Sequence, residues 1–191
     1  MKLTALKSDT IRKRGSYSFR YVLSGYFTDR TFRPMITLRV CQATRDAKFF
    51  GRIVHIFFRL LHRRACNKAG IDLPWKTKID GGFALVHGWG VVVNGRSIIG
   101  KNVTFFNGVT LGKRERIAKD GTRSNEYPVI EDEVWVGPHA IIVGGVVIGR
   151  GSRVGGGAFV TGNVPPYSTV VGNPATVVKT GGMPDVKNPA P

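Results

Sequence analysis

The chain has 191 residues, of which 42% are hydrophobic, and it carries a net charge of +17. This length predicts one folded domain with a modest extension, and the lack of a three-residue glycine period excludes a collagen-like chain. There is no run of about 18 apolar residues to predict a membrane span, and residues 1–15 lack the apolar core of a secretory signal. The two cysteines, Cys41 and Cys66, favour a reducing, cytoplasmic compartment over a disulfide framework.

The positive charge is concentrated in residues 1–70, which hold 16 Lys/Arg against three acidic residues. We expect this region to be mostly helical, because apolar residues recur near helical spacing between arginines from Ala47 to Lys68. A basic helical surface is most often simply solvated, but it also suits an anionic membrane surface or an acidic glycan. Nucleic acid is the least favoured partner, because no nucleic-acid-binding motif accompanies the charge.

From Ile99 to Val164, apolar residues recur every six positions, a period that fits neither a plain helix nor a plain strand. Such a period predicts a solenoid in which three six-residue faces close one triangular coil. We therefore expect coils at 79–98, 99–129, 130–147 and 148–164. The residues that mark the repeat are Ile99, Phe105, Leu111, Ile130, Val136, Ile142, Ile148, Val154 and Val160.

The repeat has interruptions that define its parts. Because Ile79, Leu85 and Val91 keep the six-residue step, a two-residue shift is expected at Asn94–Gly95. The polar insertion 113–127 is expected to project as a loop and to help choose the substrate. The predicted domains are a basic helical region (1–70), the solenoid domain (71–180) and a flexible tail (181–191).

Several segments together resemble one family: Leu85–Val93, Gly108–Gly112, Val164–Pro166 and Gly172–Ala175. With the repeat, they resemble the left-handed parallel β-helix acyltransferases, most closely serine acetyltransferases and capsule or colanic acid O-acetyltransferases. The resemblance implies a mainly β fold, a left-handed parallel β-helix with an N-terminal α-helical region. It also implies acetyl-CoA as the acyl donor, no metal, and a homotrimer with sites between neighbouring subunits.

His87 is the candidate general base, because a neutral imidazole can take the proton of a hydroxyl near neutral pH. The resemblance implies this role, and it implies that Asp72, fifteen residues earlier, orients the imidazole as in a hydrolase triad. Asp72 equally suits a simple turn before Pro74. A catalytic zinc ion is disfavoured, since it needs about three protein ligands and the solenoid offers only His87 and His139.

The resemblance further implies that the donor lies along a groove between coils and bonds mainly to backbone. Small residues at the corners allow such a close approach, although turn geometry alone explains any single glycine equally well. Lys179, which follows Gly172–Ala175, can pair with a phosphate of the donor. The candidate donor-binding residues are Gly137, Pro138, Gly155, Gly156, Gly157, Thr161 and Lys179.

Two departures from the serine acetyltransferase pattern bear on the acceptor. Val86 stands where that pattern has Asp, and Glu126-Tyr127 stands where it has Arg-His. Since Glu126 is expected to repel an amino-acid carboxylate, we predict a sugar hydroxyl as acceptor, in capsule, lipopolysaccharide or exopolysaccharide synthesis, free or lipid-linked. Trp89, Glu126 and Tyr127 are its candidate contacts, although packing in the solenoid core is the favoured alternative for Trp89. The alternatives are a serine O-acetyltransferase and a non-catalytic binding scaffold.

Overall fold

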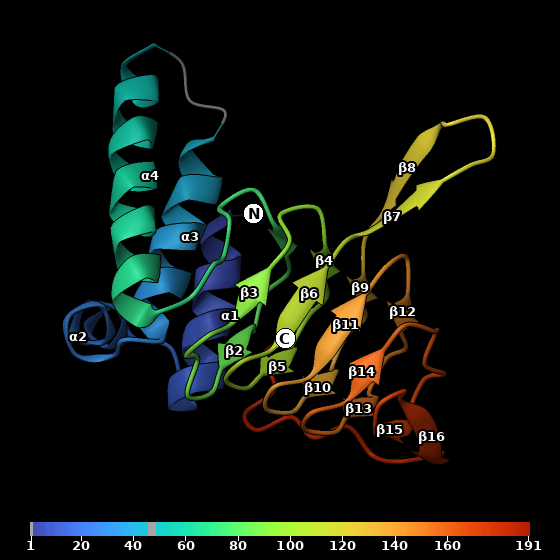
Figure 1. Ribbon diagram of the computed structural model, residues 1–191. Coiled ribbons are helices and arrows are strands. Elements are labelled where there is room, and N and C mark those ends of the chain that lie inside the picture. Colours follow the sequence, from blue (N-terminus) through green and yellow to red (C-terminus); the bar gives the residue numbers. More distant parts are fainter. Residues whose placement is uncertain (1, 46–48) are drawn as a thin grey trace.

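The computed structural model describes residues 2–45 and 49–191, and it shows a group of helices at one end of a three-sided solenoid (Figure 1). The expected helix over Ala47–Lys68 corresponds to α4, although positions 47 and 48 lie outside the described residues. Asp29 caps the third helix by accepting hydrogen bonds from the backbone N–H groups of Thr31 and Phe32, both at 3.0 Å. The helices are α1 (Lys2–Arg14), α2 (Phe19–Thr28), α3 (Phe32–Thr44) and α4 (Phe49–Ala69).

The solenoid is built from very short strands that stack into three sheets, so the predicted left-handed parallel β-helix is confirmed. The first sheet contains β1 (Lys78–Ile79), β4 (Ile98–Ile99), β9 (Val129–Ile130) and β12 (Val147–Ile148). The second contains β2 (Ala84–Leu85), β5 (Thr104–Phe105), β10 (Trp135–Val136), β13 (Arg153–Val154), β15 (Thr169–Val171) and β16 (Thr176–Lys179). The third contains β3 (Val92–Val93), β6 (Thr110–Gly112), β11 (Ile141–Val143) and β14 (Phe159–Val160).

The core of the β-helix is a set of stacked aliphatic columns. In the first sheet, Ile99 pairs in register with Ile79 and with Ile130, and Ile148 continues the column. Ile99, Ile130 and Ile148 are each at most 1% exposed. Because the second residue of each two-residue strand points inward, the six-residue repeat becomes a continuous apolar core.

The structure places the two-residue shift of the repeat at residues 86–90, so the expected shift at Asn94–Gly95 is wrong. Leu85 pairs in register with Phe105, and Val93 pairs with Leu111, which leaves two extra residues in the first coil. The position of the shift was misassigned because Val91 and Val93 are both apolar and both buried, so that either residue fits the six-residue spacing. The first coil therefore has an enlarged corner that the later coils lack.

The insertion 113–127 forms an antiparallel hairpin of β7 (Arg114–Ile117) and β8 (Arg123–Glu126) that projects away from the solenoid (Figure 1). At its base, Glu126 pairs with Arg114 and Arg116 through N–O distances of 3.3 and 2.7 Å. These contacts order the strand ends, whereas the tip residues are exposed.

A fully buried ion pair between Asp9 and Arg39 holds the helices against the first coil. Arg39 of α3 donates to Asp9 of α1 at 2.7 Å and also to the carbonyl oxygens of Ile79 and Asp80, at 2.6 and 2.7 Å. The second Asp9 oxygen accepts from the Gly82 and Phe83 amides. Neither charged side chain is more than 1% exposed, so each needs all of these partners to offset the loss of water.

The C-terminal residues 181–191 run back along the solenoid without helix or strand. Asn102 holds Ala190 by donating to its carbonyl at 2.9 Å and accepting from its amide at 3.0 Å. Arg12 of α1 donates to the carbonyl of Lys187. The flexibility expected of this tail stays a prediction, but these contacts fix where its end lies.

Candidate active site

His87 lies on the enlarged corner of the first coil. The corner backbone is tight, since the Trp89 amide donates to the His87 carbonyl at 2.5 Å, and His87 itself has a left-handed φ of 58°. That conformation is costly for a residue with a Cβ, and here it turns the imidazole out of the coil. The His87 side chain is exposed and has no hydrogen-bond partner within the described residues. A free imidazole on an outward corner suits a base that accepts a substrate proton.

The connection between α2 and α3 packs against this corner. The guanidinium of Arg30 lies over the Trp89 ring, 3.3 Å from its centroid. Thr31 contacts the next turn so closely that a Cβ on Gly88 would stand 3.1 Å from its Cγ2 atom. Trp89 remains 54% exposed on the outside of the coil and is not packed into its core. The helical region thus fixes the conformation of the His87 corner from outside.

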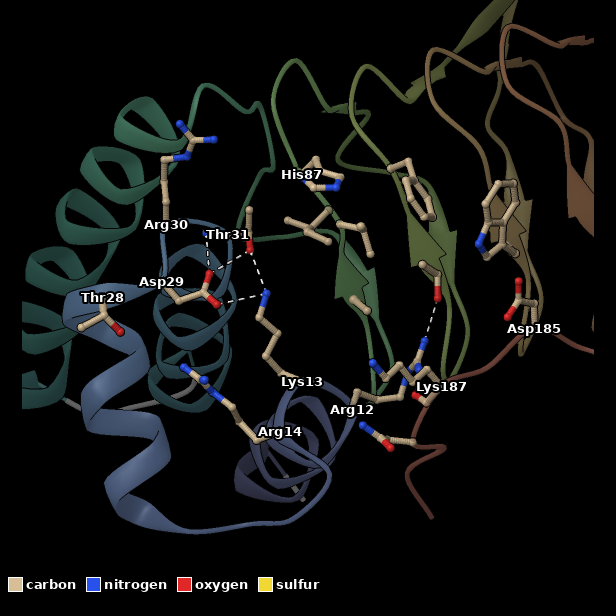
Figure 2. Close-up of a pocket in the computed structure, with 17 residues that line it drawn as sticks. Arg12, Lys13, Arg14, Thr28, Asp29, Arg30, Thr31, His87, Asp185 and Lys187 are labelled. Carbon is tan, nitrogen blue, oxygen red and sulfur yellow. Dashed lines mark hydrogen bonds and ion pairs between the residues drawn. The ribbon is translucent and has the colours of Figure 1, made fainter.

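A cavity of about 1050 Å³ opens beside His87 (Figure 2). Its walls come from α1, from the α2–α3 connection, from the outer face of β2 and β5, and from the C-terminal tail. Lys13 points into this region and donates to Thr31 at 3.2 Å while pairing with Asp29 at 3.0 Å. Burial alone would raise the pKa of Asp29, but the hydrogen bond and charge of Lys13, with the capping bonds, lower it.

Asp72 does not share this cavity with His87. Its backbone bridges to Val92, and its side chain is exposed beside a second cavity, of about 630 Å³, between α4 and the segment 71–75. No hydrogen bond joins the Asp72 carboxylate to His87 in the part of the chain that the structure describes. The orienting role of Asp72 therefore stays a prediction.

The glycine corners divide into two kinds. A Cβ on Gly137 would stand 2.7 Å from the Gly156 amide nitrogen, and one on Gly155 would stand 2.7 Å from Val171. These two glycines are needed for coil stacking. Gly157 has a φ of 68°, and a Cβ there would have nothing within 4 Å of it, so its backbone is open to a ligand. Pro138 lies beside this corner, since its carbonyl accepts a hydrogen bond from the Gly157 amide at 2.8 Å. Pro138 is half-buried, and Thr161 and Lys179 are exposed.

Glu126 and Tyr127 lie at the base of the hairpin and do not line the His87 cavity. The hydrogen bond from Arg116 is the main cause that lowers the pKa of Glu126, and Arg114 adds to it. The Tyr127 hydroxyl accepts a hydrogen bond from Arg96 at 3.2 Å. Within one chain, of the three candidate acceptor contacts, only Trp89 adjoins the candidate base.

The other histidines have structural surroundings. His139 bonds to Asn107 at 3.1 Å, and its ring covers Gly108. His62 is buried, and it bonds to the Leu73 carbonyl at 2.8 Å and to Thr37 at 2.9 Å. Within residues 2–45 and 49–191, no group of three His, Cys, Asp or Glu side chains is arranged to hold a metal ion.

Sequence reasoning missed the contribution of the helical region to the site. Lys13, Arg14, Arg30 and Thr31 line the cavity beside His87, although they precede it by more than fifty positions. The only signal was the excess of positive charge in residues 1–70. Charge alone does not say which face of a helix meets a given corner of the solenoid.

The comparisons with known proteins agree with this fold. A family model described as bacterial transferase hexapeptide (six repeats) matches residues 127–162. The serine acetyltransferase of Bacillus licheniformis is 39% identical over 162 residues, which are 81% of this chain and 73% of that protein. That of Bacillus subtilis is 33% identical over 144 residues, 75% of this chain and 62% of that protein. Against this second relative, the chain spans less than two thirds of its length.

Solved structures give the same result. The soybean serine acetyltransferase apoenzyme superposes with a TM-score of 0.73 at 31% identity, over 93% of this chain and 69% of that one. The Neisseria gonorrhoeae enzyme gives 0.72 at 28% identity, over 94% and 66%. The three-sided coil and the matched repeat define a hexapeptide-repeat acyltransferase. Within that class, the chain belongs to the serine acetyltransferase family.

The prediction of a sugar acceptor in polysaccharide synthesis is wrong. The relatives from the two Bacillus species are serine acetyltransferases, as are the soybean and Neisseria structures. The argument from Glu126 fails for a physical reason, because Arg114 and Arg116 both pair with its carboxylate. The base of the hairpin therefore carries a net positive charge and does not repel an amino-acid carboxylate.

Proposed function

We propose that the protein transfers an acetyl group from acetyl-CoA to the hydroxyl of serine. The observation that carries the proposal is the 39% identity to a serine acetyltransferase over 81% of this chain, together with the free imidazole of His87 on an open corner. A soybean relative of similar fold, with a TM-score of 0.69 and 31% identity, was solved in complex with serine.

In this mechanism His87 acts as the general base. It takes the proton from the serine hydroxyl as the oxygen attacks the thioester carbonyl, and the new C–O bond forms. When the C–S bond breaks, the imidazolium returns the proton to the departing thiolate. Backbone N–H groups at a solenoid corner are the proposed donors to the tetrahedral oxyanion.

Asp72 is proposed to stabilise the imidazolium of His87, by a contact that forms when substrates are bound. Its exposed carboxylate lies on the segment that stacks directly beneath the coil of Val92. An ionised carboxylate close to an imidazolium raises the basicity of the imidazole.

For the donor, the open corner at Gly157 supports binding of a pantetheine arm along the backbone, with Gly156 and Pro138 beside it. Thr161, exposed just after β14, is proposed as a further contact. Lys179 is exposed on β16 and suits a phosphate of acetyl-CoA. Gly137 and Gly155 contribute indirectly, because only glycine lets the coils stack so closely there.

We also propose a homotrimer in the cytoplasm. Within one chain, Glu126, Tyr127 and the open corner at Gly157 do not line the His87 cavity. In a closed cyclic assembly, these groups would serve the His87 of a neighbouring subunit. Light scattering on the purified protein gives the subunit number directly. The division of the chain at residues 70 and 180 likewise stays a proposal.

A peripheral contact with an anionic membrane stays a proposal supported by one surface of α4. Ile53, Ile56, Phe57 and Leu60 follow helical spacing there, and each is at least 54% exposed between exposed arginines such as Arg59. No helix within the described residues is long and apolar enough to cross a membrane. Flotation with phosphatidylglycerol vesicles tests the contact. Absence of binding, or equal binding by a Phe57→Glu variant, rejects it.

The acetyl transfer is tested by measuring thiol release from acetyl-CoA with and without L-serine, and by detecting O-acetylserine by mass spectrometry. We expect release that depends on serine. If thiol release does not depend on serine at any concentration tested, the proposed function is wrong.

A further inference from the structure

The corner that carries His87 differs from later corners of the solenoid in how its backbone is held. Four later corner residues share its left-handed conformation, with φ values from 55° to 62°. Each of them is fixed by its own amide, which donates to a carbonyl of the preceding coil at 2.7 to 3.0 Å. These residues are Asn102, Glu133, His139 and Tyr167. Within the described residues, the His87 amide makes no such bond.

The bond is missing because His87 belongs to the first coil, which follows α4 and not another coil. Bonding to the second coil is interrupted here as well. It stops at the Val86 amide and resumes at the Trp89 carbonyl, which accepts from the Gly108 amide at 2.7 Å. Between these points, the backbone of His87 is held by one bond in the described chain, from the Trp89 amide to its carbonyl. A left-handed residue with a Cβ persists only where its surroundings hold it, so the position of Trp89 determines that of His87.

The Trp89 ring is itself held by two segments of the helical region. Arg30, between α2 and α3, places its guanidinium 3.3 Å from the ring centroid. The benzene part of the indole lies against Gly70, directly after α4, where an added Cβ would stand 2.8 Å from the Cε3 atom. The Gly70 carbonyl also accepts from the Gly90 amide at 2.8 Å. The indole is therefore fixed although 54% of Trp89 is exposed.

Arg30 is suited to hold a ring and is not directed at the base. Figure 2 shows its side chain pointing away from His87. Its guanidinium forms no ion pair and no hydrogen bond within residues 2–45 and 49–191, so stacking on Trp89 is the interaction that the structure gives it. A planar, weakly hydrated guanidinium stacks well on an indole, whereas the ammonium of lysine has no planar face.

We propose that Arg30 and Trp89 are positioning residues for His87, and that their stack replaces the missing contact with a preceding coil. This inference rests on the proposed function, since it takes His87 as the base of the acetyl transfer. In this role neither side chain touches the reacting atoms, and both act through the backbone of the corner. A displaced base slows the chemical step without weakening substrate binding, so the effect belongs to kcat and not to KM.

Steady-state kinetics of three variants separates stacking from charge. Arg30→Lys keeps the charge and loses the planar face. Trp89→Leu removes the aromatic ring, and Trp89→Phe keeps a smaller one. The matched control is Arg20→Lys, because Arg20 is exposed on α2 and does not line the cavity beside His87.

We expect Arg30→Lys and Trp89→Leu each to lower kcat about 10-fold, with KM for serine and for acetyl-CoA within about twofold of the wild type. The double variant should lose no more than either single variant, because both remove the same stack. Trp89→Phe should recover most of the rate, and Arg20→Lys should match the wild type. A wild-type rate in Arg30→Lys overturns the proposal, as does a raised KM for serine at unchanged kcat, or additive losses in the double variant.

Hydrogen exchange of backbone amides, followed by NMR on the full chain, tests the corner without any substrate. The Trp89 amide should exchange about 10-fold faster in Arg30→Lys, whereas the His139 amide, which is bonded to Asn107 of the preceding coil, should not change. Unchanged exchange at Trp89 rejects the positioning role, even if the wild type acetylates serine normally. Faster exchange at Trp89, in a protein that does not acetylate serine, supports the positioning of the corner and rejects the proposed function alone.

Discussion

The β-helix and the helical region are stabilised by different kinds of contact. In the β-helix, the same contact recurs from coil to coil, as in the column of Ile99, Ile130 and Ile148. In the helical region, single polar contacts join distant segments, as Arg39 joins α1, α3 and the first coil. Repeated contacts spread stability along the solenoid, whereas one buried ion pair concentrates it in two side chains. The site lies where the two regions meet.

The largest effect is expected from breaking the buried pair. Arg39→Met leaves Asp9 buried without a counter-ion and should lower the free energy of unfolding by about 5 kcal/mol. Arg153→Met removes an ion pair whose side chains are 44% and 48% exposed, and it should cost under about 1 kcal/mol. Urea unfolding measures both. Equal losses of unfolding free energy would mean that the buried ion pair contributes no more to stability than the exposed one.

Next in size is the effect of the two corner histidines on catalysis. His87→Ala should lower kcat/KM about 10³-fold, equivalent to about 4 kcal/mol of barrier, because it removes the general base. His139 also has a φ of 58° at a corner of the solenoid. His139→Ala removes the hydrogen bond with Asn107 and the packing over Gly108, and it should leave the rate within about threefold. Full activity in the His87 variant would exclude the mechanism.

A smaller effect on stability is expected from adding a Cβ at glycines where neighbouring coils do or do not pack closely. Gly108 and Gly157 both have left-handed φ values, of 70° and 68°. A Cβ on Gly108 would stand 2.3 Å from His139, whereas nothing lies within 4 Å at Gly157. Gly108→Ala should therefore cost about 2 kcal/mol, and Gly157→Ala about 1 kcal/mol from backbone strain alone. Thermal unfolding compares them, and a larger loss at Gly157 would contradict the stacking argument.

The smallest effect concerns pH and the helical region. Burial lowers the pKa of His62, opposed in part by its bond to the Leu73 carbonyl. The unfolded chain therefore binds the proton more readily, so stability should fall as pH drops below about 6.5, by at most about 1.4 kcal/mol per pH unit. Urea unfolding of the wild type and of His62→Gln at pH 7.5 and 5.5 isolates the contribution of His62 to the pH dependence of stability. An identical pH dependence in both proteins would rule out His62 as its source.

The sequence predicts the repetitive part of the molecule far better than the unique part. Six-residue spacing identifies the coils because each column needs an apolar side chain at the same position. It does not locate the enlarged corner, since Val91 and Val93 both satisfy the spacing. Nor does it reveal that Arg30 stacks on Trp89, because that contact depends on how a helix connection docks on a coil. The acceptor was misjudged for the same reason, as the partners of Glu126 are visible only in three dimensions.

The buried pair of Asp9 and Arg39 also bears on how the chain assembles during synthesis. A ribosome releases the helical region first, yet the carbonyl groups that complete the bonds of Arg39 belong to Ile79 and Asp80, which follow it by 40 and 41 positions. Until those residues emerge from the ribosome, packing of α1 against α3 would bury the Arg39 guanidinium without all of its hydrogen-bond partners. We therefore expect the helical region, although it is synthesised first, to finish folding only after the first coil has formed, by packing against that coil. Pulsed proteolysis of stalled nascent chains would reveal this order.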